Sequence, residues 1–555
     1  MKIDLYPEKS QYLTNQEINL IAELFCDNEE IYEAEIEISY LNKLIKKLSC
    51  TLKNGVNIIP LEGFSTAFSG YGVDLSIIDS INKTFMAQTA FDVVDKVERS
   101  MRYGFLSDFK LEDGENHRDI ESLRKFHINM VQFYDWSYRH DNLVAPTTHY
   151  KDMMGKEINL DTVKGKIQTA KDLGMNSMAY GAIYAASKEF YEKHPDWAFY
   201  TSCGDVFKFI DTFYIMNILK ECPWHQHIIE QYHRAIDEVG FSGIHMDTYG
   251  FPKTAYSKYK GESKLVRLDE EFASLIDDTK AALSHCDKDT YLIFNNVGNW
   301  PVAPVSKANQ SAIYIEVWNP YNRYLHIKQI ISDAKAACDN KKPVILAAYL
   351  APFRLEDSKR AGYAAYILTA AIVSNGGYHL LLGEENAVLT QGYYVDHSFL
   401  QPEQVTVMRN YYDFMIRYMN LFYNDRMKDV SMTHIGWDNY EYQCSFDNWS
   451  SYGEADKVWL NIRENEDFKC ISMVNLCGCK DDLWNKGKDK PVPQEKLEFT
   501  VHVDKDIKGV YYASPDKGDT KSYPLEFTYL TNDKGKFIRF EVPYLEIWSL
   551  VYIEL

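Results

Sequence analysis

The sequence predicts a multidomain protein in which a central (β/α)8 barrel is flanked by two β-sandwich domains. Three observations predict this class. At 555 residues the chain is too long for one hydrophobic core. Apolar runs of strand length alternate with helical patterns through the middle of the chain, whereas both terminal segments show short alternating strands. We therefore expect domains at residues 1–96, 97–427 and 428–555.

The first domain is predicted from patterns of period two. Residues 16–24 and 32–40 largely alternate apolar and polar side chains, which is typical of strands with one buried and one solvated face. Neither segment carries a cluster of reactive side chains. We therefore expect an immunoglobulin-like β-sandwich with a structural role, and sugar binding is the minor alternative.

The middle domain contains eight apolar runs of strand length, at residues 102–106, 129–134, 176–180, 243–246, 291–294, 312–315, 344–348 and 378–382. Helical patterns lie between them, at residues 119–126, 162–173, 227–239, 270–283, 327–338 and 359–374. Strands that alternate with helices form parallel sheets through right-handed crossovers, and eight such units close a barrel. The alternative, an open doubly wound sheet, would normally carry a glycine-rich nucleotide-binding turn, and the sequence has no such motif.

Helical periodicity ends near residue 429, and short strand patterns return. They lie at residues 457–463, 470–476, 497–503, 536–542 and 547–555, separated by stretches rich in turn-forming residues. This pattern predicts a Greek-key β-sandwich at residues 428–555.

Charge and hydropathy exclude several classes of partner. Sixty basic and 80 acidic residues give a net charge of −20, which repels nucleic acids and anionic membrane surfaces. No apolar stretch reaches the roughly 18 residues of a membrane span, and the N-terminus lacks a signal-peptide pattern. We expect a monomer without cofactor or metal. The compartment stays open between the cytoplasm and secretion with the leader removed.

Two carboxylates end two of the predicted barrel strands, Asp247 after the fourth and Glu316 after the sixth. The carboxyl ends of barrel strands carry the chemistry in this fold. Strand ends two apart can bring carboxylates to about 5 Å from each other, the separation at which glycosidases act with retention of configuration. In that reading Asp247 is the nucleophile and Glu316 the general acid and base. The alternative is that each carboxylate caps a loop or pairs with an arginine.

Other side chains at the same predicted rim suit the recognition of sugars, because aromatic faces stack on pyranose rings and polar groups bind hydroxyls. The candidates are Asp135, Trp136, Tyr138, His140, Tyr180, Asn295, Trp318 and Glu385. For the stretch 134–141 the alternative is a packed loop in which Arg139 pairs with Asp135 or Asp141. His245, inside the strand before Asp247, is expected to be a core histidine or to orient its neighbours.

Three stretches carry a resemblance to a known family. They are Phe-Tyr-Asp-Trp-Ser-Tyr-Arg-His-Asp at residues 133–141, Gly-Ile-His-Met-Asp-Thr-Tyr-Gly at residues 243–250 and Tyr-Ile-Glu-Val-Trp at residues 314–318. They resemble glycoside hydrolase family 66, which comprises dextranases and cycloisomaltooligosaccharide glucanotransferases. The resemblance implies a sandwich, barrel and sandwich layout, Asp247 as nucleophile, Glu316 as acid and base, and dextran and isomaltooligosaccharides as binding partners.

The function expected from this resemblance is retaining endo-hydrolysis of α-1,6-glucosidic linkages in dextran. One alternative is the cyclising glucanotransferase of the same family, and another, from a different class, is a glucan-binding protein without catalysis. Cyclising members commonly carry an extra β-domain within the barrel. Here about 30 residues join the seventh and eighth strands, and about 60 join the third and fourth, which favours the hydrolase.

Overall fold

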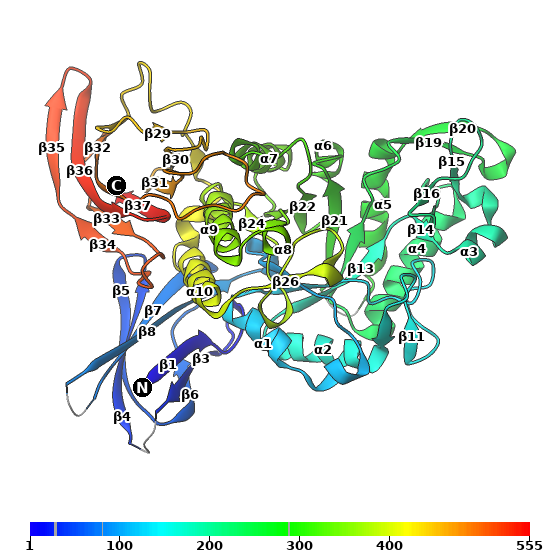
Figure 1. Cartoon of the computed structure of the whole chain (residues 1–555), viewed down its shortest axis with the longest axis horizontal. Helices are drawn as coiled ribbons and strands as arrows, with labels where there is room; N and C mark the ends of the chain where they lie inside the picture. Colours follow the sequence, from blue (N-terminus) through cyan, green and yellow to red (C-terminus); the bar gives the residue numbers. More distant parts are fainter. Residues whose placement is uncertain (27–29, 80–81, 287–288) are drawn as a thin grey trace.

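The computed structural model describes residues 1–26, 30–79, 82–286 and 289–555. A barrel of eight parallel strands occupies its centre (Figure 1), and the strands neighbour one another in chain order. They are β9 (Tyr103–Leu106), β10 (Met130–Phe133), β13 (Asn176–Ala182), β18 (Gly243–Asp247), β21 (Tyr291–Val297), β22 (Ala312–Glu316), β23 (Val344–Ala347) and β24 (Tyr378–His379). A parallel bridge between Phe105 and Gly383 nearly closes the ring. All eight predicted strands are confirmed.

Helices cover the outside of the barrel. The predicted ones are confirmed as α1 (Arg118–Lys125), α2 (Leu160–Asp172), α4 (Pro223–Arg234), α5 (Leu268–Leu283), α7 (Tyr324–Ala337) and α9 (Ser358–Ser374), and α10 (Pro402–Arg417) adds one beyond those predicted. Local sequence sets several of their first turns. The side chains of Asn159 and Asp357 accept hydrogen bonds from backbone N–H groups at the start of α2 and α9.

A long excursion separates β13 from β18 and forms a lobe at one side of the barrel (Figure 1). One small sheet of this lobe consists of β14 (Ala185–Ala186), β17 (Phe213–Ile215) and β16 (Lys208–Phe209). A second joins β15 (Phe199–Tyr200) to β19 (Thr254–Ser257) and β20 (Lys264–Arg267), which follow β18. The lobe therefore lies at the carboxyl ends of the barrel strands, where the candidate carboxylates are.

The N-terminal region forms two sheets, one with the order β1-β3-β6 and one with the order β2-β8-β7-β4-β5. The strands are β1 (Lys2–Pro7), β2 (Tyr12–Leu13), β3 (Ile18–Phe25), β4 (Tyr32–Tyr40), β5 (Lys43–Leu52), β6 (Gly55–Leu61), β7 (Phe68–Ile78) and β8 (Thr84–Val94). Buried side chains of both sheets share one apolar cluster. The alternation predicted over residues 32–40 is present, because buried and exposed side chains alternate along most of β4. The immunoglobulin-like assignment stays a prediction.

The C-terminal region also forms two sheets around a shared apolar cluster. The strands that match the predicted ones are β30 (Val458–Glu464), β31 (Phe468–Asn475), β32 (Gln494–His502), β36 (Gly535–Leu545) and β37 (Trp548–Glu554). The Greek-key assignment stays a prediction. No helix in the described part of the chain is long and apolar enough to cross a membrane.

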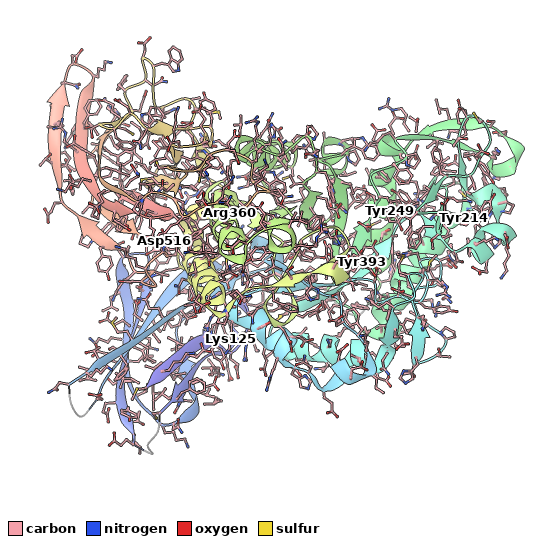
Figure 2. All side chains as sticks on the ribbon, in the orientation of Figure 1. Lys125, Tyr214, Tyr249, Arg360, Tyr393 and Asp516 are labelled. Carbon is pink, nitrogen blue, oxygen red and sulfur yellow. The ribbon has the colours of Figure 1, made fainter. Side chains whose placement is uncertain are left out.

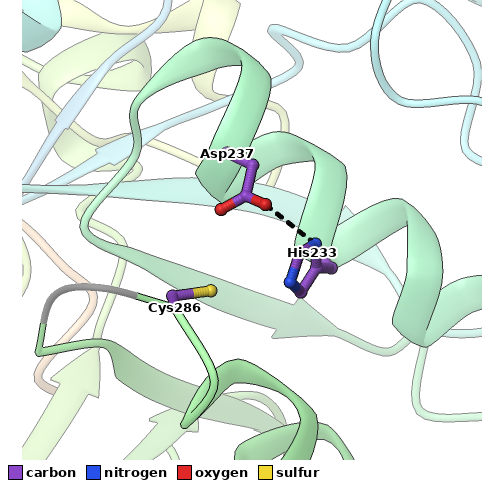
Figure 3. A group of neighbouring side chains, drawn as sticks. All are labelled: His233, Asp237 and Cys286. Carbon is purple, nitrogen blue, oxygen red and sulfur yellow. Dashed lines mark ion pairs between the residues drawn. The ribbon is translucent and has the colours of Figure 1, made fainter.

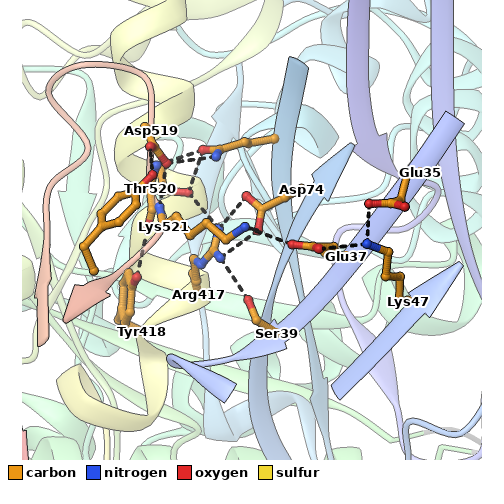
Figure 4. Close-up of polar contacts among 12 residues, drawn as sticks. Glu35, Glu37, Ser39, Lys47, Asp74, Arg417, Tyr418, Asp519, Thr520 and Lys521 are labelled. Atoms are coloured by element: carbon orange, nitrogen blue, oxygen red, sulfur yellow. Dashed lines mark hydrogen bonds and ion pairs between the residues drawn. The ribbon is translucent and has the colours of Figure 1, made fainter. Parts of the chain in front are cut away.

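A buried cation joins the three regions. Arg417, at the end of α10, donates hydrogen bonds to Asp74 and Ser39 of the N-terminal sheet and to Thr520 of the C-terminal region (Figure 4). Its side chain is fully buried and its contact with Asp74 is 2.9 Å. A buried ion pair of this kind is costly to break, because removing one partner leaves an uncompensated charge. The flanking regions are therefore anchored to the barrel.

Candidate active site

A cavity of about 490 Å³ opens at the carboxyl ends of the barrel strands. Aromatic side chains form much of its wall, including Tyr134, Phe213 and Trp318. Tyr249 and Tyr393, both labelled in Figure 2, also line it, although they follow the fourth and the eighth barrel strands. A largely aromatic wall with a few polar groups is typical of a site for small organic ligands such as sugars.

Asp247 is the last residue of β18, and its carboxylate lines this cavity. The Tyr180 hydroxyl donates to Oδ2 and the Asn295 amide donates to Oδ1, both over 2.6 Å. Burial and, secondly, the nearby Glu316 carboxylate raise the pKa of Asp247 to about 7, while the two donors act to lower it.

Glu316 is the last residue of β22 and lines the same cavity. The Trp318 indole N–H donates to Oε2 over 2.9 Å, and the Tyr349 hydroxyl donates to Oε1 over 2.7 Å. Burial raises the pKa of Glu316, against the lowering effect of these donors. The Tyr349 hydroxyl also lies 3.3 Å from that of Tyr394, so it can turn toward either neighbour.

The two carboxylates therefore form an electrostatically coupled pair, in which one negative charge opposes the other. Tyr180 has no second hydrogen-bond partner for its hydroxyl among the described residues, so its proton is directed to Asp247. A carboxylate that accepts two short hydrogen bonds is favoured in its ionised form. Glu316 also accepts two hydrogen bonds, so the arrangement suits a pair of carboxylates that carries a single negative charge.

Asp135 and His140, predicted on the loop after β10, also reach the cavity. Asp135 has a left-handed backbone, with φ of 49°, which is unusual for a residue other than glycine. Burial raises the pKa of Asp135 to about 7 and lowers that of His140 to about 4. The Nδ1 atom of His140 has no hydrogen-bond partner within the described ranges. Both side chains can therefore bind a ligand hydroxyl.

The packed-loop alternative for this stretch is not found. Arg139 donates to the backbone oxygens of Tyr138 and Lys151 and does not pair with Asp135 or Asp141 within the structure as described. Its guanidinium lies 4.1 Å from the centre of the Tyr138 ring. That contact covers one face of Tyr138, which does not line the cavity, so its predicted role as a sugar platform does not fit.

Two further predicted residues lie away from the cavity. Trp136 is fully buried, donates its indole N–H to the backbone oxygen of Tyr180 over 3.1 Å, and packs against Phe241. It belongs to the core and has no free face for a sugar, so the platform prediction for Trp136 is wrong. Glu385 is solvent-exposed and accepts a hydrogen bond from Asn116 over 2.6 Å. A third predicted residue, Asn295, is fully buried and donates its side-chain N–H to Asp247.

Several residues of the site were not predicted. Tyr349 lies two residues after the end of β23 and donates to Glu316, so the rule that strand ends carry the chemistry could have identified it. Phe209 and Phe213 come from the excursion, which gives no sequence signal for this position. His245 lines the cavity and is also buried, with Nδ1 2.9 Å from the Tyr103 hydroxyl. Burial lowers the pKa of His245 to about 3, which keeps it neutral.

Among the residues that the structure describes, two groups of side chains have a spacing that could hold a metal ion. One is His233, Asp237 and Cys286 on the outside of the barrel (Figure 3), where His233 and Asp237 already pair over 3.2 Å. The other is Asp108, Glu384 and His397. In that group Glu384 is already held by the backbone N–H and hydroxyl of Ser107. Neither group includes Asp247 or Glu316.

Known proteins are similar to this chain in sequence and in fold. The model of glycosyl hydrolase family 66 matches residues 7–552. A curated cycloisomaltooligosaccharide glucanotransferase from Niallia circulans is 24% identical over 88% of this chain, and the chain spans 64% of that relative's length. The crystal structure of a Paenibacillus cycloisomaltooligosaccharide glucanotransferase with cycloisomaltoheptaose has a TM-score of 0.89 at 21% identity, with 99% of each chain covered. A maltogenic α-amylase from Thermotoga neapolitana has a TM-score of 0.53 at 11% identity, covering 82% of this chain and 99% of its own.

Proposed function

Because the chain belongs to glycosyl hydrolase family 66, we propose that it cleaves α-1,6-linked glucan with retention of configuration, as an endo-acting dextranase. The observation that carries the proposal is the pair of carboxylates, Asp247 and Glu316, that ends two barrel strands and faces one aromatic cavity. Their unlike hydrogen-bond partners suit them to unlike roles. Two carboxylates with divided roles are what a retaining glycosidase requires.

In the first step the ionised Asp247 attacks the anomeric carbon. Glu316 gives its proton to the glycosidic oxygen as the bond to the leaving sugar breaks. The Tyr180 and Asn295 donors hold the attacking carboxylate in place. The product of this step is a glycosyl ester of Asp247, which carries no negative charge.

In the second step Glu316 acts as base. Formation of the ester removes the negative charge beside Glu316, so the pKa of Glu316 falls and its carboxylate can take a proton from water. The water attacks the anomeric carbon from the side that the leaving sugar occupied. Asp247 is released as a carboxylate, and two inversions give net retention.

Asp135, His140 and Trp318 are proposed to bind the glucan. Asp135 and His140 reach the cavity with unused hydrogen-bonding capacity, and Trp318 is 42% exposed at its rim. Hydroxyl hydrogen bonds exchanged with water add little net affinity, so aromatic contacts are expected to contribute most of the binding energy.

Cyclisation of the chain by an intramolecular sugar hydroxyl is the second candidate, because two of the similar proteins are named cycloisomaltooligosaccharide glucanotransferases. The barrel connections favour hydrolysis. Residues 348–377, between β23 and β24, contain α8 (Pro352–Leu355) and α9, and the excursion contains short sheets. In the described residues, both connections consist of these elements and carry no additional β-domain.

Product analysis on dextran tests both candidates. We expect linear isomaltooligosaccharides, first formed as the α-anomer by proton NMR, and no release of sugar from starch or cellulose. The Asp247→Gly variant is the control and is expected to release nothing, since the nucleophile is removed. If cyclic products were the main fraction, the proposal of hydrolysis would be replaced by that of cyclisation. Dextran binding without any product would instead support the glucan-binding alternative.

A further inference from the structure

A second cavity, of about 470 Å³, lies at the opposite end of the barrel from the carboxylates. Pro343 and Gly376, which line it, precede β23 and β24, so they mark the amino ends of those strands. Phe68 of β7 and Phe468 of β31 also line it. The cavity is therefore a junction of the N-terminal region, the barrel and the C-terminal region.

Two cations converge at Gly376 in this cavity. Lys335, in the last turn of α7, lines the cavity, and Arg463 approaches from β30. A Cβ built on Gly376 would lie 2.4 Å from Lys335 Nζ and 3.0 Å from Arg463 Nη1. Gly376 also has φ of 75°, so a side chain is disfavoured there for two reasons. Because Gly376 has no side chain, the ends of Lys335 and Arg463 can both occupy the space beside it.

Neither Lys335 nor Arg463 forms an ion pair with any carboxylate in the described ranges. Arg463 is 8% exposed and donates to the backbone oxygen of Phe422. The buried arginines Arg102 and Arg417 differ, because each pairs with an aspartate over 2.8–2.9 Å. Burial and the neighbouring Arg463 lower the pKa of Lys335 to about 7. The charge of Asp429 acts on both side chains, but Asp429 is itself paired with Lys328 over 2.8 Å. Adjacent cations without a carboxylate partner of their own are unfavourable in a partly desolvated site.

The cavity as a whole carries more positive than negative charge. Three carboxylates line it, and one of them, Asp467, is already held by Arg426 over 3.2 Å. The cations that line it are Arg99, Lys335, Lys341, Lys342 and Arg426. Arg99, Lys341 and Arg426 each pair with a carboxylate, whereas Lys335 has no such partner in the described ranges. In a chain with a net charge of −20 this local excess is distinctive. An anion is the ligand that the site would stabilise.

We propose that this cavity binds a small phosphate oxyanion, either inorganic phosphate or the phosphate group of a small metabolite, through Lys335 with Arg463 beside it. Lysine and arginine are the side chains that bind phosphate most readily, as a point charge and as a planar donor fork. The volume exceeds that of inorganic phosphate alone, so a phosphate monoester also fits. A bound anion would contact the barrel through Lys335 and the C-terminal region through Arg463, and would stabilise the junction between these two regions. This site is independent of the proposed glucan chemistry.

Thermal unfolding with added sodium phosphate tests the proposal, with sodium chloride at equal ionic strength as reference. A ligand that binds only the folded state raises Tm with its concentration. We expect a saturable rise for the wild type and for Lys341→Met, and no rise for Lys335→Met. Lys341 is the matched control, because it lines the same cavity with a side chain 77% exposed. An equal rise in all three proteins, or none in the wild type, would overturn the proposal.

Glucose 6-phosphate and glucose distinguish the two sources of the phosphate group. A rise in Tm with both inorganic phosphate and glucose 6-phosphate supports a site for the oxyanion alone. A rise only with glucose 6-phosphate, dependent on Lys335, supports a phosphate monoester. A rise with glucose equal to that with glucose 6-phosphate contradicts the site, because glucose carries no charge.

A chemical readout keeps the proposal testable if Lys335→Met does not fold. The wild-type protein is treated with limiting acetic anhydride at pH 7.5, and acetylation of each lysine is followed by mass spectrometry. A neutral amine is the form that reacts, so Lys335 is expected to react readily, and phosphate is expected to slow its acetylation at least about threefold. Lys341 is the internal control and should not be protected. Unchanged acetylation of Lys335 in phosphate would overturn the proposal.

Discussion

Two carboxylates of similar chemistry acquire different properties from the side chains next to them. Asp247 accepts from Tyr180 and Asn295, whereas Glu316 accepts from Trp318 and Tyr349. Burial raises the pKa of both groups, and their mutual repulsion makes it unfavourable for both to be ionised. The proposed division between nucleophile and acid therefore rests on a pair that carries one negative charge.

Replacement of Glu316 tests its role as a proton donor. We expect Glu316→Gln to lower kcat/KM on dextran by roughly 100-fold or more relative to its effect on an aryl α-isomaltoside with a good leaving group. A good leaving group departs without a proton, so formation of the glycosyl ester survives on the aryl substrate. The check is steady-state kinetics on both substrates. Equal losses on both would point to a binding or structural role.

Replacement of Tyr180 tests the control of the nucleophile's pKa. The Tyr180 hydrogen bond lowers the pKa of Asp247, so Tyr180→Phe should raise it. Asp247 must be ionised to attack, so the acid limb of the kcat/KM profile should move to higher pH, by roughly 0.5 to 1 unit. Tyr138→Phe, outside the cavity, is the control and should leave the limb in place. A shift to lower pH would contradict the assignment.

The strands and the connections of the barrel contribute different parts of the site. Strand pairing holds Asp247 and Glu316 at the ends of β18 and β22, and Asn295 two residues before the end of β21. The excursion after β13 contributes Phe209 and Phe213 to the aromatic wall of the cavity. In such a wall the shape of the surface matters more than the exact position of one atom. This division lets connections change the substrate preference without disturbing the reactive groups.

Two tryptophans, one after the second barrel strand and one after the sixth, are expected to behave in opposite ways. Trp318→Ala removes an exposed cavity residue and a donor to Glu316, so kcat/KM on dextran should fall by about 1–3 kcal/mol in transition-state terms, with little change in Tm. Trp136→Ala removes a fully buried side chain and should lower the free energy of unfolding by about 3–5 kcal/mol. Kinetics and thermal unfolding of both variants provide the check. If Trp136→Ala instead lost activity on dextran and kept its stability, Trp136 would have to be assigned to the substrate site.

In the whole molecule, the flanking regions are packed against the barrel through positions that only glycine can occupy. A Cβ on Gly70 would lie 1.8 Å from the backbone oxygen of Ile416, and one on Gly72 would lie 2.2 Å from Arg417 Nε. Helix α10 therefore rests directly on the backbone of β7. The close approach explains why Arg417 can reach Asp74 and remain fully buried.

Substitution of Gly72 tests this packing. We expect Gly72→Ala to lower the free energy of unfolding by about 1–3 kcal/mol, because Arg417 cannot move without losing its contacts with Asp74. Activity per folded molecule should be unchanged. Gly165→Ala is the control: a Cβ there meets nothing within 4 Å, and alanine is the better helix former in α2. Urea unfolding followed by tryptophan fluorescence compares them, and equal midpoints for the two variants would contradict the packing argument.

The barrel and its reactive rim could be predicted because their signals are local. A buried parallel strand is a short apolar run, and the residue that follows it faces the rim whatever the rest of the chain does. For this reason the eight strands were identified, and Asp247 and Glu316 were expected at one edge before any contact was known. The motifs around Asp247 and Glu316 also indicated the family, since they are short and contiguous.

Contacts between distant segments were beyond the reach of such patterns. Trp136 and Trp318 are both aromatic residues after strands, yet one is buried against Phe241 and the other is exposed at the cavity. The pKa of Asp247 depends on Tyr180, Asn295 and Glu316, and the convergence of Lys335 and Arg463 depends on a glycine from a third element. Burial, hydrogen bonding and repulsion act through space, so only the folded arrangement decides which side chains work together.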